Sequence, residues 1–239
     1  MNPLKHNLAK IISKCNKLIK LHKKSQIGQR ILMYHSVSPL YSAEIANDIY
    51  TLDEKLFFSH MSYIKDQHDL ETKHIEAENF LLPSELSIHI TFDDGYKNAL
   101  SVVAPIMEEL NIPFTVFVAT NFLEKSHPNH LSKIELKTLA AKSVVKIGSH
   151  SQSHLNLTHL TKDQIKDEIM NSKLILQDII GEEVDGFSYP FGGVNKRVRD
   201  IVEESGYKYA ANSCFNINIV NHDRFMLCRC EIWNLDTLP

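Results

Sequence analysis

The sequence predicts an α/β protein, a distorted (β/α)7 barrel of TIM-like form that follows an N-terminal amphipathic helix. From about residue 30 onward, strand-like apolar runs alternate with helix-like periodic segments, with short links and no domain-sized break. The run 113–119 is apolar apart from Thr115, which is typical of a strand buried on both faces in a parallel sheet. About seven or eight such units indicate that the sheet closes.

Length and composition fit an ordinary globular chain. The 239 residues are 43% hydrophobic and 23% charged, and no apolar run is long enough to cross a bilayer. The four cysteines form neither a disulfide framework nor a Cys-x-x-Cys zinc site, which fits a reducing compartment. We therefore divide the chain into a basic helix, residues 1–29, and one barrel, residues 30–239.

The charge is unevenly distributed. Residues 1–30 carry eight Lys or Arg and no acidic residue, whereas residues 31–239 carry 18 basic and 29 acidic residues. The acidic barrel argues against nucleic-acid binding. The N-terminal apolar residues recur at helical spacing: Leu4, Leu8, Ile11, Ile12, Cys15, Leu18 and Ile19.

Two interpretations of this helix stay open. It either docks on the barrel wall or a partner with its lysines in water, or it makes peripheral contact with an anionic membrane through residues 4–22. The stretch lacks the continuous apolar region of a signal peptide. We therefore expect a cytoplasmic protein, or one peripheral at the cytoplasmic membrane.

The elements follow in order along the chain. A capping box of Thr161 and Gln164 begins one helix, and Gly206 closes another. We expect strands at 29–36, 87–90, 113–119, 144–148, 184–189, 207–212 and within 224–233. We expect helices at 51–67, 98–110, 132–142, 161–181 and 195–205.

Two adjacent carboxylates, Asp93 and Asp94, follow the strand at 87–90 and precede Gly95. Asp-Gly is a common solvated turn pair, which is the simpler interpretation. At a strand end, however, the pleat breaks, and both carboxylates can face one pocket. Two close carboxylates repel each other, so either one is protonated or a cation lies beside them.

A pair of histidines follows the strand at 144–148. His150 and His154 are four residues apart, so both rings face one point if a helical turn begins here. Two imidazoles and a carboxylate, with an open position for water, have the composition of a catalytic zinc site. His35 and the turn 190–192 also follow predicted strands, so all these groups should meet at one face of the barrel.

These residues resemble a known family. Thr-Phe-Asp-Asp-Gly-Tyr (91–96), His-Ser-x-x-His (150–154) and Tyr-Pro-Phe-Gly (189–192) are similar in order and spacing to motifs of the polysaccharide deacetylases of carbohydrate esterase family 4, the NodB homology domain. The start Leu-Met-Tyr-His (32–35) further resembles the poly-N-acetylglucosamine deacetylase branch. The resemblance covers about residues 30–235 and implies a (β/α) barrel of about seven strands.

The resemblance also implies roles. Asp93 would be the general base, and Asp94, His150 and His154 would hold a divalent metal, commonly Zn²⁺, with Co²⁺ or Ni²⁺ as alternatives. The backbone N–H of Phe191 would stabilise the oxyanion, and His35 would be the general acid. We expect substrate contacts from Tyr96, Pro190, Phe191 and Gly192.

The sequence departs from the family pattern at one functional position. The arginine that orients the base is replaced by Ser188. Arg229 is a candidate substitute, although we favour a surface or edge-strand charge for it. We expect His222, in a turn-like stretch, to be solvated.

Three functions remain open. The first is metal-dependent removal of acetyl groups from N-acetylated sugars of a polysaccharide or glycolipid, as in the synthesis of a cell-surface polysaccharide. The second is a sugar O-acetyl esterase or another metal-dependent amide hydrolase. The third is a non-catalytic barrel that binds a glycan or a partner, against which the intact aspartates and histidines argue.

Overall fold

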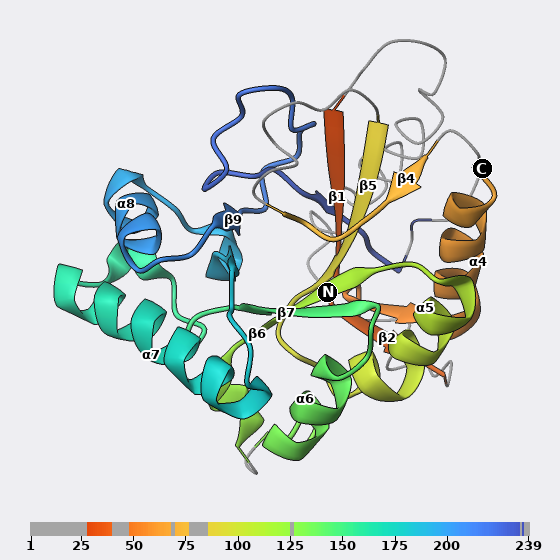
Figure 1. Ribbon diagram of the computed structural model, residues 1–239, viewed down its shortest axis with the longest axis horizontal. Helices are drawn as coiled ribbons and strands as arrows, with labels where there is room; N and C mark the ends of the chain where they lie inside the picture. The colour runs from red at the N-terminus through yellow and green to blue at the C-terminus, as the bar shows by residue number, and fades with distance from the viewer. Residues whose placement is uncertain are drawn as a thin grey trace.

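A computed structural model describes residues 28–39, 48–67, 70–76, 86–124, 127–234 and 236. Within these residues one sheet runs in the order β10-β1-β5-β6-β7-β8-β9, with every neighbouring pair parallel, and β4 pairs with the start of β5. The strands are β1 (Gly28–Tyr34), β4 (Glu71–Thr72), β5 (Leu86–Phe92), β6 (Phe114–Val118), β7 (Val145–Ser149), β8 (Gly186–Ser188), β9 (Tyr209–Ala211) and β10 (Cys230–Glu231). The sheet is strongly curled (Figure 1).

The segment 224–229 links the two ends of this strand order. The N–H of Ala210 donates to the carbonyl of Arg224 (2.8 Å), and the N–H of Asn212 donates to that of Leu227 (2.8 Å). The same segment continues into β10, which pairs with β1. The predicted closure into a seven-stranded (β/α) barrel is confirmed, although the last strand is only two residues long.

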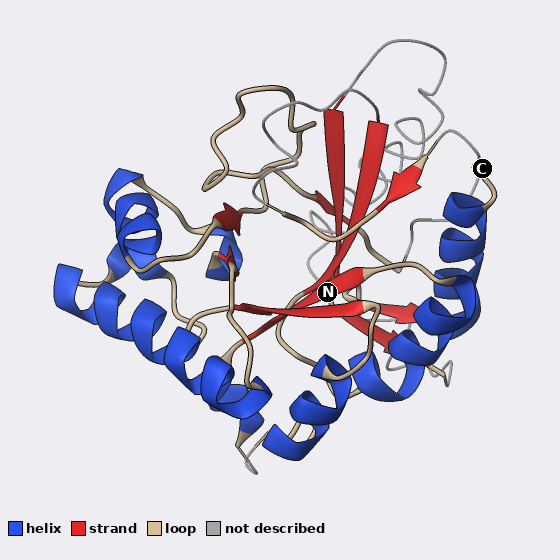
Figure 2. Cartoon of the chain, in the orientation of Figure 1, coloured by secondary structure: helices blue, strands red, loops and turns tan. Residues whose placement is uncertain are grey.

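Helices cover the outside of the strands (Figure 2). They are α4 (Glu54–Lys65), α5 (Ala104–Leu110), α6 (Lys133–Ala140), α7 (Lys162–Ile180) and α8 (Lys196–Glu204). A π-helix (Ala99–Val103) precedes α5, and 3-10 turns lie at Thr120–Leu123, Leu157–His159 and Pro190–Gly192. The predicted capping box of Thr161 and Gln164 is present at the start of α7.

Two helix predictions need correction. Residues 51–53 were expected to be helical, but β3 (Thr51–Asp53) pairs with β2 (Ser36–Ser38) in a separate small sheet. The Asp53 carboxylate accepts from the N–H of Lys55 (2.9 Å), and so caps α4 at its observed start. The first turns of the helix predicted over 98–110 are π-helical, a form that occurs often beside functional sites.

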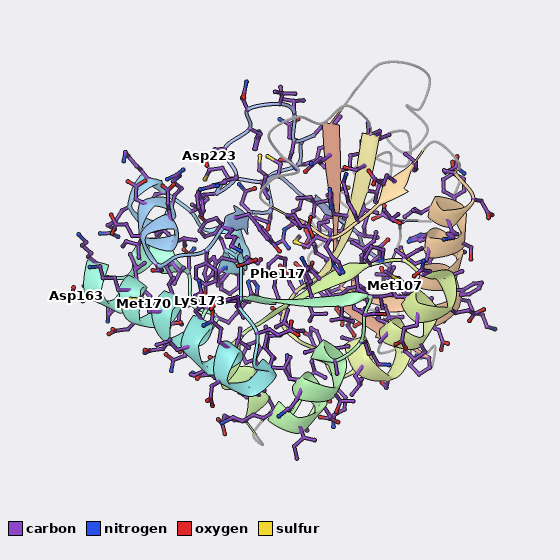
Figure 3. All side chains as sticks on the ribbon, viewed as in Figure 1. Met107, Phe117, Asp163, Met170, Lys173 and Asp223 are labelled. Carbon is purple, nitrogen blue, oxygen red and sulfur yellow. The ribbon has the colours of Figure 1, made fainter. Side chains whose placement is uncertain are left out.

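The apolar residues pack on both sides of the sheet. All five residues of β6 are buried, as the apolar run at 113–119 predicts. A large cluster lies between strands and helices, and includes Phe57, Phe92 and Phe114. A smaller cluster around Phe117, near the middle of the fold in Figure 3, packs with Ile31, Ile75, Tyr209, Ala211 and Leu227.

The N-terminal helix expected at residues 1–29 lies outside the described residues, apart from Gly28 and Gln29, which begin β1. Among the described helices, none combines the length and the hydropathy that crossing a membrane requires.

Candidate active site

A cavity of about 450 Å³ lies at the carboxyl ends of the strands. Its wall includes most of the site residues predicted from the sequence: His35, Asp93, Asp94, Tyr96, His150, His154 and Phe191. They come from the segments after β1, β5, β7 and β8. Because parallel strands end at one edge, residues far apart in sequence meet here.

The turn after β5 directs two adjacent carboxylates into this cavity. The N–H of Asp93 donates to the carbonyl of Tyr34 on β1 (3.0 Å), which prolongs the sheet by one residue. Asp94 and Gly95 then adopt left-handed backbone conformations, with φ of 72° and 77°. A Cβ at position 95 would lie 3.1 Å from Cγ1 of Val118, so glycine suits both the turn and the close packing.

Asp94, His150 and His154 form a candidate metal centre. Oδ1 of Asp94 lies 3.5 Å from Nε2 of His150 and 3.3 Å from Nε2 of His154, and the two Nε2 atoms are 3.2 Å apart. Each of the three residues offers one ligand atom, and these atoms all lie within 4.8 Å of one another. Two imidazoles and one carboxylate suit Zn²⁺ and leave a coordination position for water or substrate.

The protonation states also fit a cation. Nδ1 of His150 donates to the Ser188 carbonyl (2.7 Å), which leaves the Nε2 lone pair facing the cluster. Burial lowers the pKa of His150 to about 4, so the ring is neutral at pH 7. Oδ1 of Asp94 is buried without a hydrogen-bond donor. Burial, together with the charge of Asp93, raises the pKa of Asp94 to about 6. A cation would satisfy this carboxylate.

The two histidines converge without the predicted helical turn. They lie in a loop, in which Ser151 and His154 have φ of 64° and 53°. Glu168 on α7 holds this loop, since its carboxylate accepts from the N–H groups of Gln152 (3.0 Å) and Ser153 (2.7 Å). The two histidines meet as the spacing predicted, but the predicted helical turn is absent, and Glu168 carried no signal in the sequence.

Asp93 is held by Arg229. The guanidinium donates from Nη1 to Oδ1 and from Nη2 to Oδ2, both at 2.7 Å, and also donates to Oγ of Ser188 (2.8 Å). Ser188 in turn donates to Oδ2 of Asp93 (3.1 Å). The favoured interpretation of Arg229 as a surface or edge-strand charge is therefore wrong, since this side chain is buried in the barrel.

The bidentate pair determines the charge of Asp93. Burial alone would raise the pKa of this carboxyl group, but the charge and hydrogen bonds of Arg229, together with His150, outweigh burial. The pKa of Asp93 lies well below its usual range, so Asp93 is ionised at neutral pH. The Arg229 guanidinium therefore makes the contact with Asp93 that the family pattern assigns to an arginine at position 188.

His35 lies in the cavity wall directly after β1. Its ring packs against Tyr50, with centroids 4.8 Å apart, and its buried Nδ1 has no hydrogen-bond partner. Burial lowers the pKa of His35, which the charges of Asp93 and Asp94 partly oppose. His222, expected to be solvated, is partly buried and bonds through Nε2 to the Met226 carbonyl (3.0 Å).

Of the turn Pro190–Gly192, Phe191 lines the cavity, whereas Pro190 and Gly192 are not among the lining residues. The Phe191 ring lies 4.7 Å from that of His154, and the Phe191 backbone is left-handed, with φ of 58°. The N–H groups of Gly192 and Gly193 donate within the turn. A Cβ at position 192 would lie 2.9 Å from Cβ of Ser213.

Tyr96 lies beside the cluster, stacked on His130 with centroids 4.5 Å apart. Burial and the nearby charges of Asp94 and Asp48 raise the pKa of Tyr96 to about 12, so its hydroxyl stays protonated.

Five further residues line the cavity and were not predicted as site residues: Met33, Tyr50, Tyr189, Ser213 and Glu231. Glu231 had a detectable signal. It lies two residues after Arg229 on one extended segment, and such residues share a face.

Comparisons with known proteins give a consistent result. The family model described as polysaccharide deacetylase matches residues 83–210. YxkH of Bacillus subtilis, named as a polysaccharide deacetylase, is 30% identical over 182 residues, which are 74% of this chain and 62% of YxkH. The chain matches less than half the length of the next two curated relatives.

Solved structures share the fold. The Streptococcus pyogenes deacetylase PplD, solved in complex with acetate, has a TM-score of 0.81 at 21% identity, covering 90% of this chain and 96% of PplD. IcaB from Ammonifex degensii has a TM-score of 0.74 at 20% identity, covering 87% and 93% of the two chains.

Proposed function

The chain belongs to the polysaccharide deacetylase family, and from this premise we propose that it is a metal-dependent hydrolase that removes acetyl groups from N-acetylated sugars. The observation that carries the proposal is the contrast between two adjacent carboxylates. Asp93 is ionised against Arg229, whereas Asp94 faces two imidazoles with a buried oxygen that lacks a donor. One residue is suited to act as a base, and the other as a ligand.

Asp94, His150 and His154 would hold the divalent ion, with Zn²⁺ favoured by two nitrogen ligands and one oxygen ligand and with Co²⁺ or Ni²⁺ as alternatives. When bound, such an ion lowers the pKa of water to about 7 and polarises a carbonyl. The hydrogen bond from Nδ1 of His150 to Ser188 orients the ring for this task.

Asp93 accepts the proton of the attacking water. Its carboxylate lies 3.7 Å from Nε2 of His150, beside the metal ligands. Arg229 and Ser188 fix its orientation and keep it ionised before each turnover. Water then adds to the acetyl carbon, and the carbonyl oxygen gains negative charge.

The Phe191 N–H would donate a hydrogen bond to that oxygen. The next two N–H groups, of Gly192 and Gly193, donate within the turn and so do not compete for this role. His35 passes a proton to the amine when the C–N bond breaks. Since burial lowers the pKa of His35, this proton comes during turnover from the water that Asp93 deprotonates.

The substrate class is an N-acetylated glycan, either a polysaccharide or a glycolipid. Tyr96 and Phe191 line the cavity in which the sugar would bind, and Pro190 and Gly192 belong to the same turn as Phe191. PplD, which shares the fold, was solved with acetate, the product that deacetylation releases. An O-acetyl ester would meet the same groups, and therefore a sugar O-acetyl esterase is the second candidate.

The test measures acetate release and metal content together. Zinc-loaded protein should release acetate from N-acetylglucosamine oligomers faster than from O-acetylated xylan; the reverse order would favour the esterase. Asp93→Asn should keep the metal and lose activity by about 10²–10⁴-fold. Asp94→Asn should lose the metal. If Asp93→Asn loses the metal while Asp94→Asn keeps it, the assignment of roles is wrong.

A further inference from the structure

Two residues of the cavity wall, Tyr50 and Glu231, have no part in the proposed chemistry. Both line the cavity that contains Asp93, Asp94 and the two histidines of the candidate metal centre. Neither belongs to the segments that follow β5, β7 and β8, from which those groups come. Polar and aromatic groups that face a catalytic cavity without serving the reaction itself are suited to fix the position of a substrate.

The backbone of β10 holds Glu231 in the cavity wall. Glu231 pairs with Met33 on β1, and the N–H of Ile232 donates to the Met33 carbonyl (2.9 Å). Glu231 lies two residues after Arg229 on one extended segment, so both side chains lie on the inner face of the barrel. Because this segment is part of the sheet, the carboxylate starts from a fixed position, as a preorganised binding group does.

The Glu231 carboxylate is not neutralised by an ion pair within the described part of the chain. The Arg229 guanidinium, on the same face, donates instead to both carboxylate oxygens of Asp93 (2.7 Å each) and through Nε to the Asn212 carbonyl (2.9 Å). Burial raises the pKa of Glu231, and Trp233 and Arg229 oppose the rise only in part. A partly buried carboxylate without a cationic partner is costly, and hydroxyl groups of a ligand would satisfy it.

Tyr50 places an aromatic ring on the same side of the cavity. The ring packs on that of His35, with centroids 4.8 Å apart, and Tyr50 is 38% exposed. Its N–H donates to Oδ1 of Asp48 (3.0 Å), which anchors the backbone. Burial raises the pKa of Tyr50, and among the neighbouring charges Glu231 adds the most, followed by Asp48. The phenol therefore stays protonated, in a region of negative charge.

The proposed reaction brings the sugar ring to these two residues. His35 passes a proton to the leaving nitrogen, and this nitrogen is bonded directly to the sugar ring. Tyr50 packs on His35, and Glu231 acts on Tyr50, so both border the ring of the bound sugar. An aromatic ring and a carboxylate are complementary to a sugar, because the aromatic face packs against C–H groups and the carboxylate accepts from hydroxyl groups.

We infer that Tyr50 and Glu231 form a sugar-binding subsite that selects neutral N-acetylated sugars over carboxylated ones. The inference rests on the proposed deacetylation, since that reaction brings a sugar beside His35. The Glu231 carboxylate accepts from ring hydroxyl groups, and the Tyr50 ring packs against the apolar face of the sugar. A carboxylate on the sugar would approach Glu231 and Asp48, and like charges brought together weaken binding.

The test measures sugar binding by NMR titration of the zinc-loaded full chain carrying Asp93→Asn, in which the sugar is not hydrolysed. The ligands are the methyl glycoside of N-acetylglucosamine and the analogues that each lack one free hydroxyl group. Adding Glu231→Ala should weaken binding of the parent sugar by at least about tenfold, as expected for a hydrogen bond to a charged group. At least one analogue should bind with and without Glu231→Ala within about twofold, because it lacks the hydroxyl that Glu231 accepts from.

The aromatic ring has a matched control. Tyr50→Leu should weaken binding of the parent sugar by about threefold to tenfold. Phe58→Leu replaces a ring of similar exposure, 40%, on α4, outside the cavity lining, and should leave binding unchanged. Glu109→Ala, at an exposed position on α5, is the control for Glu231→Ala. Thermal melts and zinc content establish that all variants are folded and hold the metal equally.

The charge of Glu231 is tested with carboxylated sugars. The ligands are the methyl glycosides of N-acetylmuramic acid and N-acetylglucosaminuronic acid, and both should bind at least about tenfold more weakly than N-acetylglucosamine at low salt. Glu231→Gln should reduce this difference by at least about threefold for one or both. The variant keeps the size of the side chain, so a change in the ratio reports on charge and not on space.

The outcomes separate this inference from the proposed deacetylation. Acetate release by the chain with native Asp93 tests the reaction on the same sugars. The subsite is overturned if no sugar binds, if Glu231→Ala binds the parent sugar as tightly as its background, or if it weakens every analogue equally. An unchanged ratio in Glu231→Gln overturns the selection against carboxylated sugars. If no acetate is released while binding depends on Glu231 and one hydroxyl, the subsite stands and the hydrolase assignment fails.

Discussion

Two cavities at opposite ends of the barrel differ in how their charges are paired. The cavity at the carboxyl ends, about 450 Å³, contains the buried pair Asp93–Arg229 and an Asp94 oxygen that lacks a donor. The cavity at the amino ends of β7, β8 and β9 is about 350 Å³. There Lys146 pairs with Glu76 (3.1 Å) and Lys208 with Asp185 (3.0 Å), and these side chains are partly exposed to water.

The comparison shows that the presence of a cavity does not by itself identify a catalytic site. In the cavity at the amino ends of the strands (the lower cavity), the charged side chains form ion pairs with each other or are hydrated. In the cavity at the carboxyl ends of the strands (the upper cavity), Asp93 and Asp94 are shielded from water. Their surroundings shift their pKa values in opposite directions, down for Asp93 and up for Asp94. Neighbouring titratable groups whose pKa values are shifted apart by their surroundings are typical of catalytic sites.

The largest expected effect comes from removing a candidate metal ligand. His150→Ala should abolish stoichiometric metal binding and lower acetate release by more than about 100-fold, because two ligands cannot hold the ion in place. Metal content by mass spectrometry measures this. His159→Ala, an exposed histidine near the same loop, is the control and should keep both properties. Retained metal in His150→Ala would remove this residue from the ligand set.

The buried ion pair predicts a loss of both stability and activity. Arg229→Met should lower the free energy of unfolding by about 3–5 kcal/mol, since the Asp93 carboxylate is left buried without its partner. Urea denaturation gives the value, and the exposed Arg224→Gln is the control. Adding Asp93→Asn to Arg229→Met should restore part of the stability. A double variant no more stable than Arg229→Met would mean that the charge of Asp93 is not the cause.

Acid should destabilise the fold through a histidine outside the active site. His89 on β5 is buried and bonds through Nδ1 to the Lys73 carbonyl (2.9 Å), and burial lowers its pKa from 6.5 to about 4. Between these two values the unfolded chain binds the proton and the folded chain does not. The contribution of His89 to stability is therefore fully present above about pH 6.5 and is lost as the pH drops toward 4, by at most about 1.4 kcal/mol per pH unit for this one group.

The variant His89→Gln tests this assignment. It should reduce the pH slope of the unfolding free energy, measured by urea titration of metal-free protein at several pH values between 4 and 7. His159→Gln, at an exposed position, should leave the slope unchanged. If the pH slope of His89→Gln equals that of the wild type, His89 is not the cause, and other buried histidines must account for the loss of stability in acid.

The smallest effect is expected in the lower cavity. Lys208→Gln removes a partly exposed pair with Asp185, and such pairs contribute about 0–1 kcal/mol. Acetate release and metal content should equal those of the wild type. A loss of activity in this variant would break the distinction between the two cavities.

The sequence determined the order of elements and most of the site. Alternating apolar runs and helical periods predicted the parallel barrel, because these periods reflect burial along each segment. The positions after strands then predicted that Asp93, Asp94, His150 and His154 would meet, because parallel strands end at one face.

Only the tertiary structure decided what holds these groups. Arg229 and Asp93 are 136 residues apart, and Glu168 reaches the loop of His150 and His154 from a helix. Local sequence carries no signal for such pairs, since each arises from the register of the closed sheet and its helices. For the same reason Arg229, which resembles a surface charge in sequence, is buried when segment 224–229 closes the barrel.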